Sequence, residues 1–213
     1  MATFPAFLDT CALYGAYLCD TLLCLAEAGT YRPLWSVGVL DELERNLLER
    51  GLPKEAVTYR IREMRRSFPD AEVRGYESLI DDMTCDPKDR HVLSAAVRGN
   101  AEVLITFNTR DFPDESTSAY DIRIAHPDDF LLDLLDLYPG DVMSALRTQA
   151  RGYKNPAINP DSLSMTHCAV HNAHEGVERA DTECTSAGSE PPSKWHRVLM
   201  PAPVSLVSSF RTE

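Results

Sequence analysis

Four acidic side chains in this sequence could do chemistry: Asp9, Glu42, Asp89 and Asp111. Asp9 ends the first predicted strand, and Glu42 lies one turn into the helix after the second. Asp89 begins the helix before a third apolar run, and Asp111 follows that run. In a parallel α/β sheet, ligand sites form beyond the C-terminal ends of the strands, so we expect these carboxylates to converge at one edge. Carboxylates gathered this closely repel one another unless a cation neutralises them, which predicts a site for Mg²⁺ or Mn²⁺. Such an ion could activate water for attack on a phosphodiester.

Each of these carboxylates also has a structural interpretation when it is taken alone. Asp9 could form a turn at the end of a strand, and Asp89 could cap a helix. Glu42 could be a surface helix carboxylate, and Asp111 an ordinary loop residue. The metal hypothesis therefore depends on all of them lying at strand ends.

An alternation of strands and helices must position these residues. Apolar runs predict strands over residues 3–8, 31–36, 101–106 and 121–125, and residues 71–80 are expected to be a connector. Helical periodicity predicts helices over 12–28, 37–49, 54–68, 89–99, 130–137 and 141–149, with Asp128 capping the one that begins at 130. Short loops between alternating elements predict an α/β fold of three layers, α/β/α, with helices on both faces of a central, mostly parallel sheet.

The chain divides into three parts by composition and periodicity. Residues 1–138 are expected to form the α/β domain, and residues 139–163 a helical C-terminal extension. From 164 to 213 the periodicity disappears and Pro, Ser, Thr, Ala and Glu dominate, which predicts a disordered tail. A frameshifted or degenerate end would also look like this.

The charge of the chain limits how it could meet nucleic acid. Thirty-three acidic against 21 basic residues give a net charge of −12, which argues against broad, non-specific adhesion to phosphates. A nuclease with a local basic path is still compatible with this charge. The helix predicted at 54–68 carries a local basic face, formed by Arg60, Arg62, Arg65 and Arg66. This face could be a solvated helix surface, or it could contact a phosphate or a partner.

Cysteine usage and hydropathy favour a cytoplasmic protein. The six cysteines include no CxxC pair, so a structural zinc site is not expected, and Cys11, Cys19 and Cys24 are predicted to pack in the core. The first residues lack the basic segment and cleavage site of a secretory signal. No window approaches the roughly 20 apolar residues of a membrane helix.

Four segments occur in the order and spacing of a known set of motifs: LDTCAL, VLDELERNL, DPKDRHVLSAA and VLITFNTRDF. Over residues 4–138 the chain resembles PIN domains, the nuclease fold that includes the VapC toxins of bacterial type II toxin-antitoxin pairs. The resemblance implies a metal-dependent endoribonuclease with Mg²⁺ or Mn²⁺ as its cofactor. It also implies an RNA substrate, a cognate antitoxin and a homodimer.

The resemblance assigns roles to individual positions. It makes Asp9, Glu42 and Asp89 the metal ligands, Asp86 a supporting loop residue, and Thr106 the strand-end hydroxyl common in this fold.

One position departs from the family pattern. Asn108 stands where many PIN domains carry an aspartate, so Asp111 could supply the missing charge, or the site could hold one ion rather than two. Arg110 and His91 are candidates for phosphate contact, with solvation and local packing as equal alternatives.

Three functions remain to be distinguished. The leading hypothesis is an endoribonuclease acting as the toxin of an operon pair, and the alternative is a non-catalytic PIN module that binds RNA or a protein partner. A phosphatase-like hydrolase with Asp9 as its nucleophile is disfavoured, because LDTCAL lacks a second aspartate two residues later. The class of RNA depends on loops and groove shape that the sequence does not reveal.

Overall fold

The sheet has five strands, and every neighbouring pair is parallel. The computed structural model describes residues 3–152 of the 213 in the chain. In spatial order the strands are β3 (Glu72–Val73), β2 (Arg32–Ser36), β1 (Pro5–Leu8), β4 (Val103–Ile105) and β5 (Arg123–Ala125). The predicted parallel α/β fold is confirmed, and the predicted tail at 164–213 lies outside the described residues.

The central strands are apolar because both of their faces are covered. Phe7 and Leu8 of β1 and Leu104 and Ile105 of β4 are completely buried, as is Trp35 of β2. Parallel strands that are packed on both faces have no solvent side on which to place polar residues, so they form continuous apolar runs.

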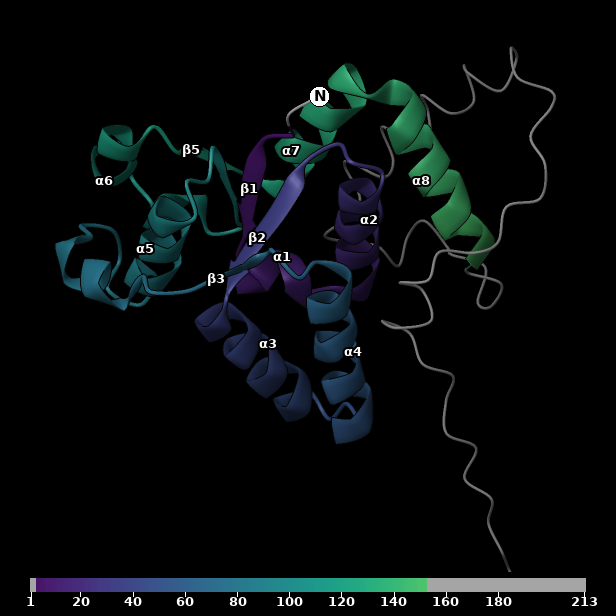
Figure 1. Ribbon diagram of the computed structural model, residues 1–213, viewed down its shortest axis with the longest axis horizontal. Helices are drawn as coiled ribbons and strands as arrows, with labels where there is room; N and C mark the ends of the chain where they lie inside the picture. Colours follow the sequence, from purple (N-terminus) through teal and green to yellow (C-terminus); the bar gives the residue numbers. More distant parts are fainter. Residues whose placement is uncertain (1–2, 153–213) are drawn as a thin grey trace, which may run out of the picture.

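The helices lie on opposite sides of this sheet, which gives the expected three layers. Figure 1 shows α2 (Ala16–Glu27) and α4 (Lys54–Ser67) on one side of the strands and α5 (Arg90–Arg98) on the other. The remaining helical elements are α1 (Thr10–Tyr14), α3 (Val37–Glu49), η1 (Glu77–Asp82), η2 (Thr109–Asp111), α6 (Asp114–Thr117), η3 (Ser118–Tyr120), α7 (Pro127–Leu137) and α8 (Pro139–Gly152).

The strand order creates a switch point between β1 and β4. From β1 the chain proceeds outward through β2 to β3, then returns across the sheet to β4 and continues to β5. Right-handed crossovers in these two directions place their helices on opposite faces. The loops after β1 and β4 therefore diverge, and the space between them is where open α/β sheets bind ligands.

Two elements differ from the sequence-based expectation. The helix predicted at 12–28 is broken at Gly15, whose extended backbone separates α1 from α2. Residues 71–80 are not merely a connector, because Glu72 and Val73 pair with Trp35 and Ser36 as the edge strand β3. A two-residue strand contains too little alternation to be recognised from periodicity alone.

The prediction that Asp128 caps the helix before Phe130 is wrong. The helix begins at Pro127, and the ring nitrogen of His126 accepts the backbone N–H of Asp128 at 3.2 Å. Proline suits the first helical position because it fixes φ and has no N–H to leave unpaired. Arg60 is also not on the basic surface of α4: it is 3% exposed, and its guanidinium donates to the carbonyl of Leu13.

Helix α8 packs against α2 beyond the sheet (Figure 1). The Thr21 hydroxyl donates to the Gln149 side-chain oxygen at 2.8 Å, and the Gln149 amide donates to the carbonyl of Tyr17 at 2.9 Å. The helical part of the predicted extension is thus attached to the domain by a polar clamp. Within residues 3–152, no helix has the length and apolarity needed to cross a bilayer.

Candidate active site

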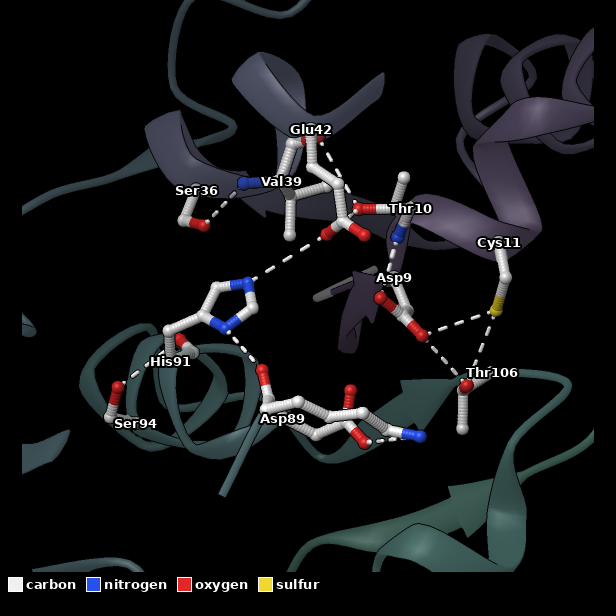
Figure 2. Close-up of polar contacts among 11 residues, drawn as sticks. Asp9, Thr10, Cys11, Ser36, Val39, Glu42, Asp89, His91, Ser94 and Thr106 are labelled. Atoms are coloured by element: carbon white, nitrogen blue, oxygen red, sulfur yellow. Dashed lines mark hydrogen bonds and ion pairs between the residues drawn. The ribbon is translucent and has the colours of Figure 1, made fainter. Parts of the chain in front are cut away.

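Asp9 occupies the switch point between β1 and β4. The side chain is 5% exposed, and one carboxylate oxygen accepts the backbone N–H of Thr10 at 2.6 Å. The other oxygen accepts the hydroxyl of Thr106 at 2.8 Å and the thiol of Cys11 at 3.1 Å (Figure 2). Hydrogen bonds from two strand ends therefore hold this buried carboxylate in one orientation.

Thr106 connects Asp9 to the loop that follows β4. It is completely buried, and its hydroxyl also accepts the backbone N–H of Asn108 at 3.0 Å. A hydroxyl can donate and accept at the same time, so this side chain satisfies a carboxylate and an amide together.

Cys11 is a contact of Asp9 that sequence analysis assigned only to core packing. Its sulfur lies 3.3 Å from the Thr106 hydroxyl and accepts the backbone N–H of Phe107 at 3.2 Å. Burial and the adjacent charge of Asp9 raise the pKa of the thiol to about 12, so it keeps its proton at neutral pH. Its position two residues after a strand-end aspartate was the available signal.

Glu42 extends from α3 and lies on the side of Asp9 away from Thr106 in Figure 2. Ser36 caps this helix by accepting the backbone N–H of Val39 at 3.1 Å, which fixes where the helix starts. One Glu42 oxygen accepts the hydroxyl of Thr10 at 2.9 Å, and the Nε2 atom of His91 is 3.9 Å from the same oxygen. His91 therefore faces Glu42.

Gly38 allows α3 to come this close to His91. A Cβ atom at this position would lie 2.9 Å from the Tyr76 hydroxyl oxygen and 3.4 Å from the imidazole ring of His91. A larger residue at this position would require the Tyr76 hydroxyl to shift.

Asp89 lies at the start of α5, within a loop tied to the one after β4. The backbone N–H of Asp86 donates to the carbonyl of Asp111 at 3.1 Å, and that of Lys88 donates to the Asp86 carboxylate at 3.1 Å. The Lys88 ammonium bridges the two loops, 2.9 Å from Asp111 and 3.8 Å from Asp89. Although Asp89 occupies the N-cap position, its side chain makes no capping hydrogen bond.

The electrostatic environment of Asp89 shows that the acidic groups share one region. Burial raises the pKa of Asp89 to about 6; Lys88 opposes this rise, and the negative charges of Asp9, Asp111 and Asp86 add to it. The charge of Asp9 therefore reaches Asp89, although the two residues come from segments eighty residues apart in sequence. One Asp89 oxygen is buried and has no hydrogen-bond partner among the described residues.

These residues have the chemistry that a divalent cation requires. The donor set consists of carboxylate oxygens, and an unsatisfied buried carboxylate oxygen is costly unless a cation or a donor reaches it. In residues 3–152, no three His, Cys, Asp or Glu side chains already stand as a group able to hold a metal. Asp9 and Glu42 are turned toward hydroxyls and Asp111 toward Lys88, so ligation would require these side chains to exchange partners.

The remaining predicted residues lie at the rim. Asn108 and Arg110 are exposed at η2, and the Asn108 side chain makes no capping hydrogen bond with that turn. Asp111 is half-buried beside Lys88. Sequence reasoning missed three contacts of the predicted carboxylates, namely Thr10, Cys11 and Lys88, although each is adjacent to one of those carboxylates or two residues from it.

Comparison with known proteins divides the chain into two matched parts. Residues 5–110 match the family described as PIN domain, and residues 127–164 match the family described as VapC50 C-terminal domain. A protein of Mycobacterium tuberculosis named "Putative ribonuclease VapC50" is 47% identical over 89 residues, which are 42% of this chain. The match spans about half of that relative, 53% of its length. No solved structure matches the chain significantly.

The hydrogen bonds of Thr106 predict how the site responds to loss of one hydroxyl. We expect Thr106→Val to lower the free energy of unfolding by about 1–3 kcal/mol, because the isosteric side chain leaves the Asn108 amide and an Asp9 oxygen short of a buried partner. Thr106→Ser keeps the hydroxyl and should retain most of that stability. Urea unfolding of the two variants measures the difference. A loss of stability in Thr106→Ser with none in Thr106→Val would show that the methyl contact, not the hydroxyl, is what matters.

The raised pKa of Asp89 predicts that this carboxylate destabilises the metal-free protein. Its folded pKa of about 6 exceeds the ordinary value of 3.8. Ionisation of Asp89 therefore lowers the free energy of unfolding fully above pH about 6, and not at all below pH 3.8. We expect Asp89→Asn to raise the free energy of unfolding in EDTA at pH 7.5 by about 1 kcal/mol, after allowance for solvent screening. The gain should disappear near pH 4. Unfolding curves at the two pH values test this, and a gain that persists at pH 4 contradicts it.

Proposed function

The chain belongs to the PIN-domain family, and from this membership we propose that it is a metal-dependent endoribonuclease. The proposal depends on one observation about Asp89. The charge of Asp9 raises its pKa, and one of its oxygens is buried without a hydrogen-bond partner among the described residues. The relative named "Putative ribonuclease VapC50" supports RNA as the substrate.

In this proposal Asp9, Glu42 and Asp89 hold Mg²⁺ or Mn²⁺, with Asp111 as a fourth acidic group. When bound, the ion lowers the pKa of a water molecule for attack on phosphorus and offsets charge that develops on the phosphoryl oxygens. Mg²⁺ and Mn²⁺ are both hard cations that prefer oxygen ligands, so the donor set suits either.

The neighbouring side chains position these ligands. The Thr106 hydroxyl and the Cys11 thiol orient Asp9, and the Thr10 hydroxyl orients Glu42. Groups that hold a ligand in this way commonly matter for affinity almost as much as the ligand itself. In this proposal Arg110 and His91 contact phosphate at the rim, and Asn108 and Asp86 shape the loops that carry Asp111 and Asp89.

We also propose a biological setting for this activity. The match of residues 127–164 to the VapC50 C-terminal domain supports a toxin of a type II toxin-antitoxin pair, acting in the cytoplasm and restrained by a cognate antitoxin. A homodimer is part of the same expectation.

Cleavage of total RNA tests the enzymatic proposal. We expect cleavage with Mg²⁺ or Mn²⁺ and none with EDTA. Asp9→Asn and Asp89→Asn should each lower the rate by more than about 100-fold, since loss of a supporting residue around a metal alone costs about 10- to 100-fold. The initial rate on a labelled RNA at fixed metal concentration is the measurement.

Asp41→Asn is the matched control for this assay. It removes a carboxylate next to Glu42 in sequence, but its side chain is exposed. Its rate should stay within about twofold of the wild-type rate, as is usual for a surface substitution. RNA binding without cleavage in any metal would favour the non-catalytic PIN module instead.

Expression in a bacterial host tests the toxin proposal. The wild-type chain should arrest growth, and Asp9→Asn and Asp89→Asn should relieve the arrest at equal protein levels. Co-expression of the product of a short neighbouring reading frame should also relieve it. Arrest that is unchanged in both variants would rule out the metal site as the cause of toxicity.

A further inference from the structure

The chain supplies a cation of its own to the acidic cluster. The Lys88 ammonium lies 2.9 Å from one Asp111 oxygen and 3.8 Å from Asp89, and the Asp89 oxygen it faces is the buried one without a hydrogen-bond partner. The ammonium is thus close enough to offset the charge of this oxygen, but too far away to satisfy it by a hydrogen bond.

The backbone of Lys88 is anchored, whereas its side chain can leave. The backbone N–H donates to Asp86, and the backbone carbonyl lies 2.9 Å from the Nδ1 atom of His91. The side chain, in contrast, is 63% exposed. An exposed lysine is held to a carboxylate only weakly and can move its ammonium into water without unfolding the loop.

We propose that Lys88 sets the affinity of the site for its divalent ion, by competing with that ion for Asp89 and Asp111. The inference rests on the proposed function, which places the ion at these carboxylates. In the metal-free protein the ammonium reduces repulsion among the acidic side chains. To bind the ion through Asp111, the protein must first release this ion pair.

Two physical effects act in the same direction. Release of the Lys88 ion pair costs free energy that the metal must supply, and a positive charge that stays near the site repels a second cation. Because the ammonium is exposed, water screens both effects, so the change in affinity should be modest. If Lys88 instead contacted an RNA phosphate, its substitution would leave the affinity for the metal unchanged.

Calorimetric titration of the full chain with MnCl₂, after removal of metal by a chelator, measures this competition without RNA or catalysis. We expect Lys88→Gln to bind Mn²⁺ about two- to fivefold more tightly than the wild type, the range set by an exposed ion pair. Lys88→Arg retains the charge and should stay close to the wild type. Lys54→Gln is the matched control, since it removes one positive charge at an exposed position at the start of α4.

Tighter binding by Lys88→Gln alone supports the inference. Equal affinity of Lys88→Gln and the wild type, in a protein whose Mn²⁺ binding is lost in Asp89→Asn, overturns the role of Lys88 and leaves the proposed metal site intact. A similar gain in Lys54→Gln overturns it as well, because overall charge would then be the cause. If Asp89→Asn binds Mn²⁺ as the wild type does, or if neither the wild type nor Lys88→Gln binds it, the metal site and the role of Lys88 both fail.

Discussion

Repulsion between carboxylates at one edge of the sheet is the constraint on which this site depends. Asp9, Asp111 and Asp86 lie close enough to Asp89 for their negative charges to raise its pKa. The side chains of Asp9 and Asp89 are satisfied differently. Donors from Thr10, Thr106 and Cys11 surround Asp9, whereas Asp89 keeps a buried oxygen without a donor. The unsatisfied charge is thus concentrated on the α5 side of the site.

The strand order explains why these groups meet at all. The loops after β1 and β4 separate at the switch point, and Asp9 and Thr106 lie directly on either side of it. The backbone N–H of Asp9 also donates to the carbonyl of Ile105 at 3.1 Å, so the sheet continues to the first residue of the site. Glu42 of α3 contacts this centre through the Thr10 hydroxyl, and Asp89, at the start of α5, lies near enough for the charge of Asp9 to raise its pKa.

Short elements near the centre allow the close approaches that long regular ones would prevent. The five-residue helix α1 places Thr10 beside Glu42 and Cys11 beside Thr106 before the chain changes direction at Gly15. The buried Arg60 guanidinium holds the end of α1 by its contact with the carbonyl of Leu13. Helix α1 is therefore joined to α4 through Arg60 and to the end of β4 through Thr106, so its position depends on both elements.

The sequence by itself determined the parallel α/β class, most of the strands and helices, and the carboxylates at the strand ends. Those features arise from apolar runs and helical periods, which are local properties of the chain. The two-residue strand β3, the break at Gly15 and the cap at His126 arise from pairing and packing with distant segments, so periodicity did not reveal them. Only the tertiary structure could decide that Cys11 contacts Asp9 and that the Lys88 ammonium enters the acidic cluster. Side chains that meet across a switch point come from loops that are far apart in sequence. The distance between them depends on where the two crossovers end, which the spacing of residues along the chain does not determine.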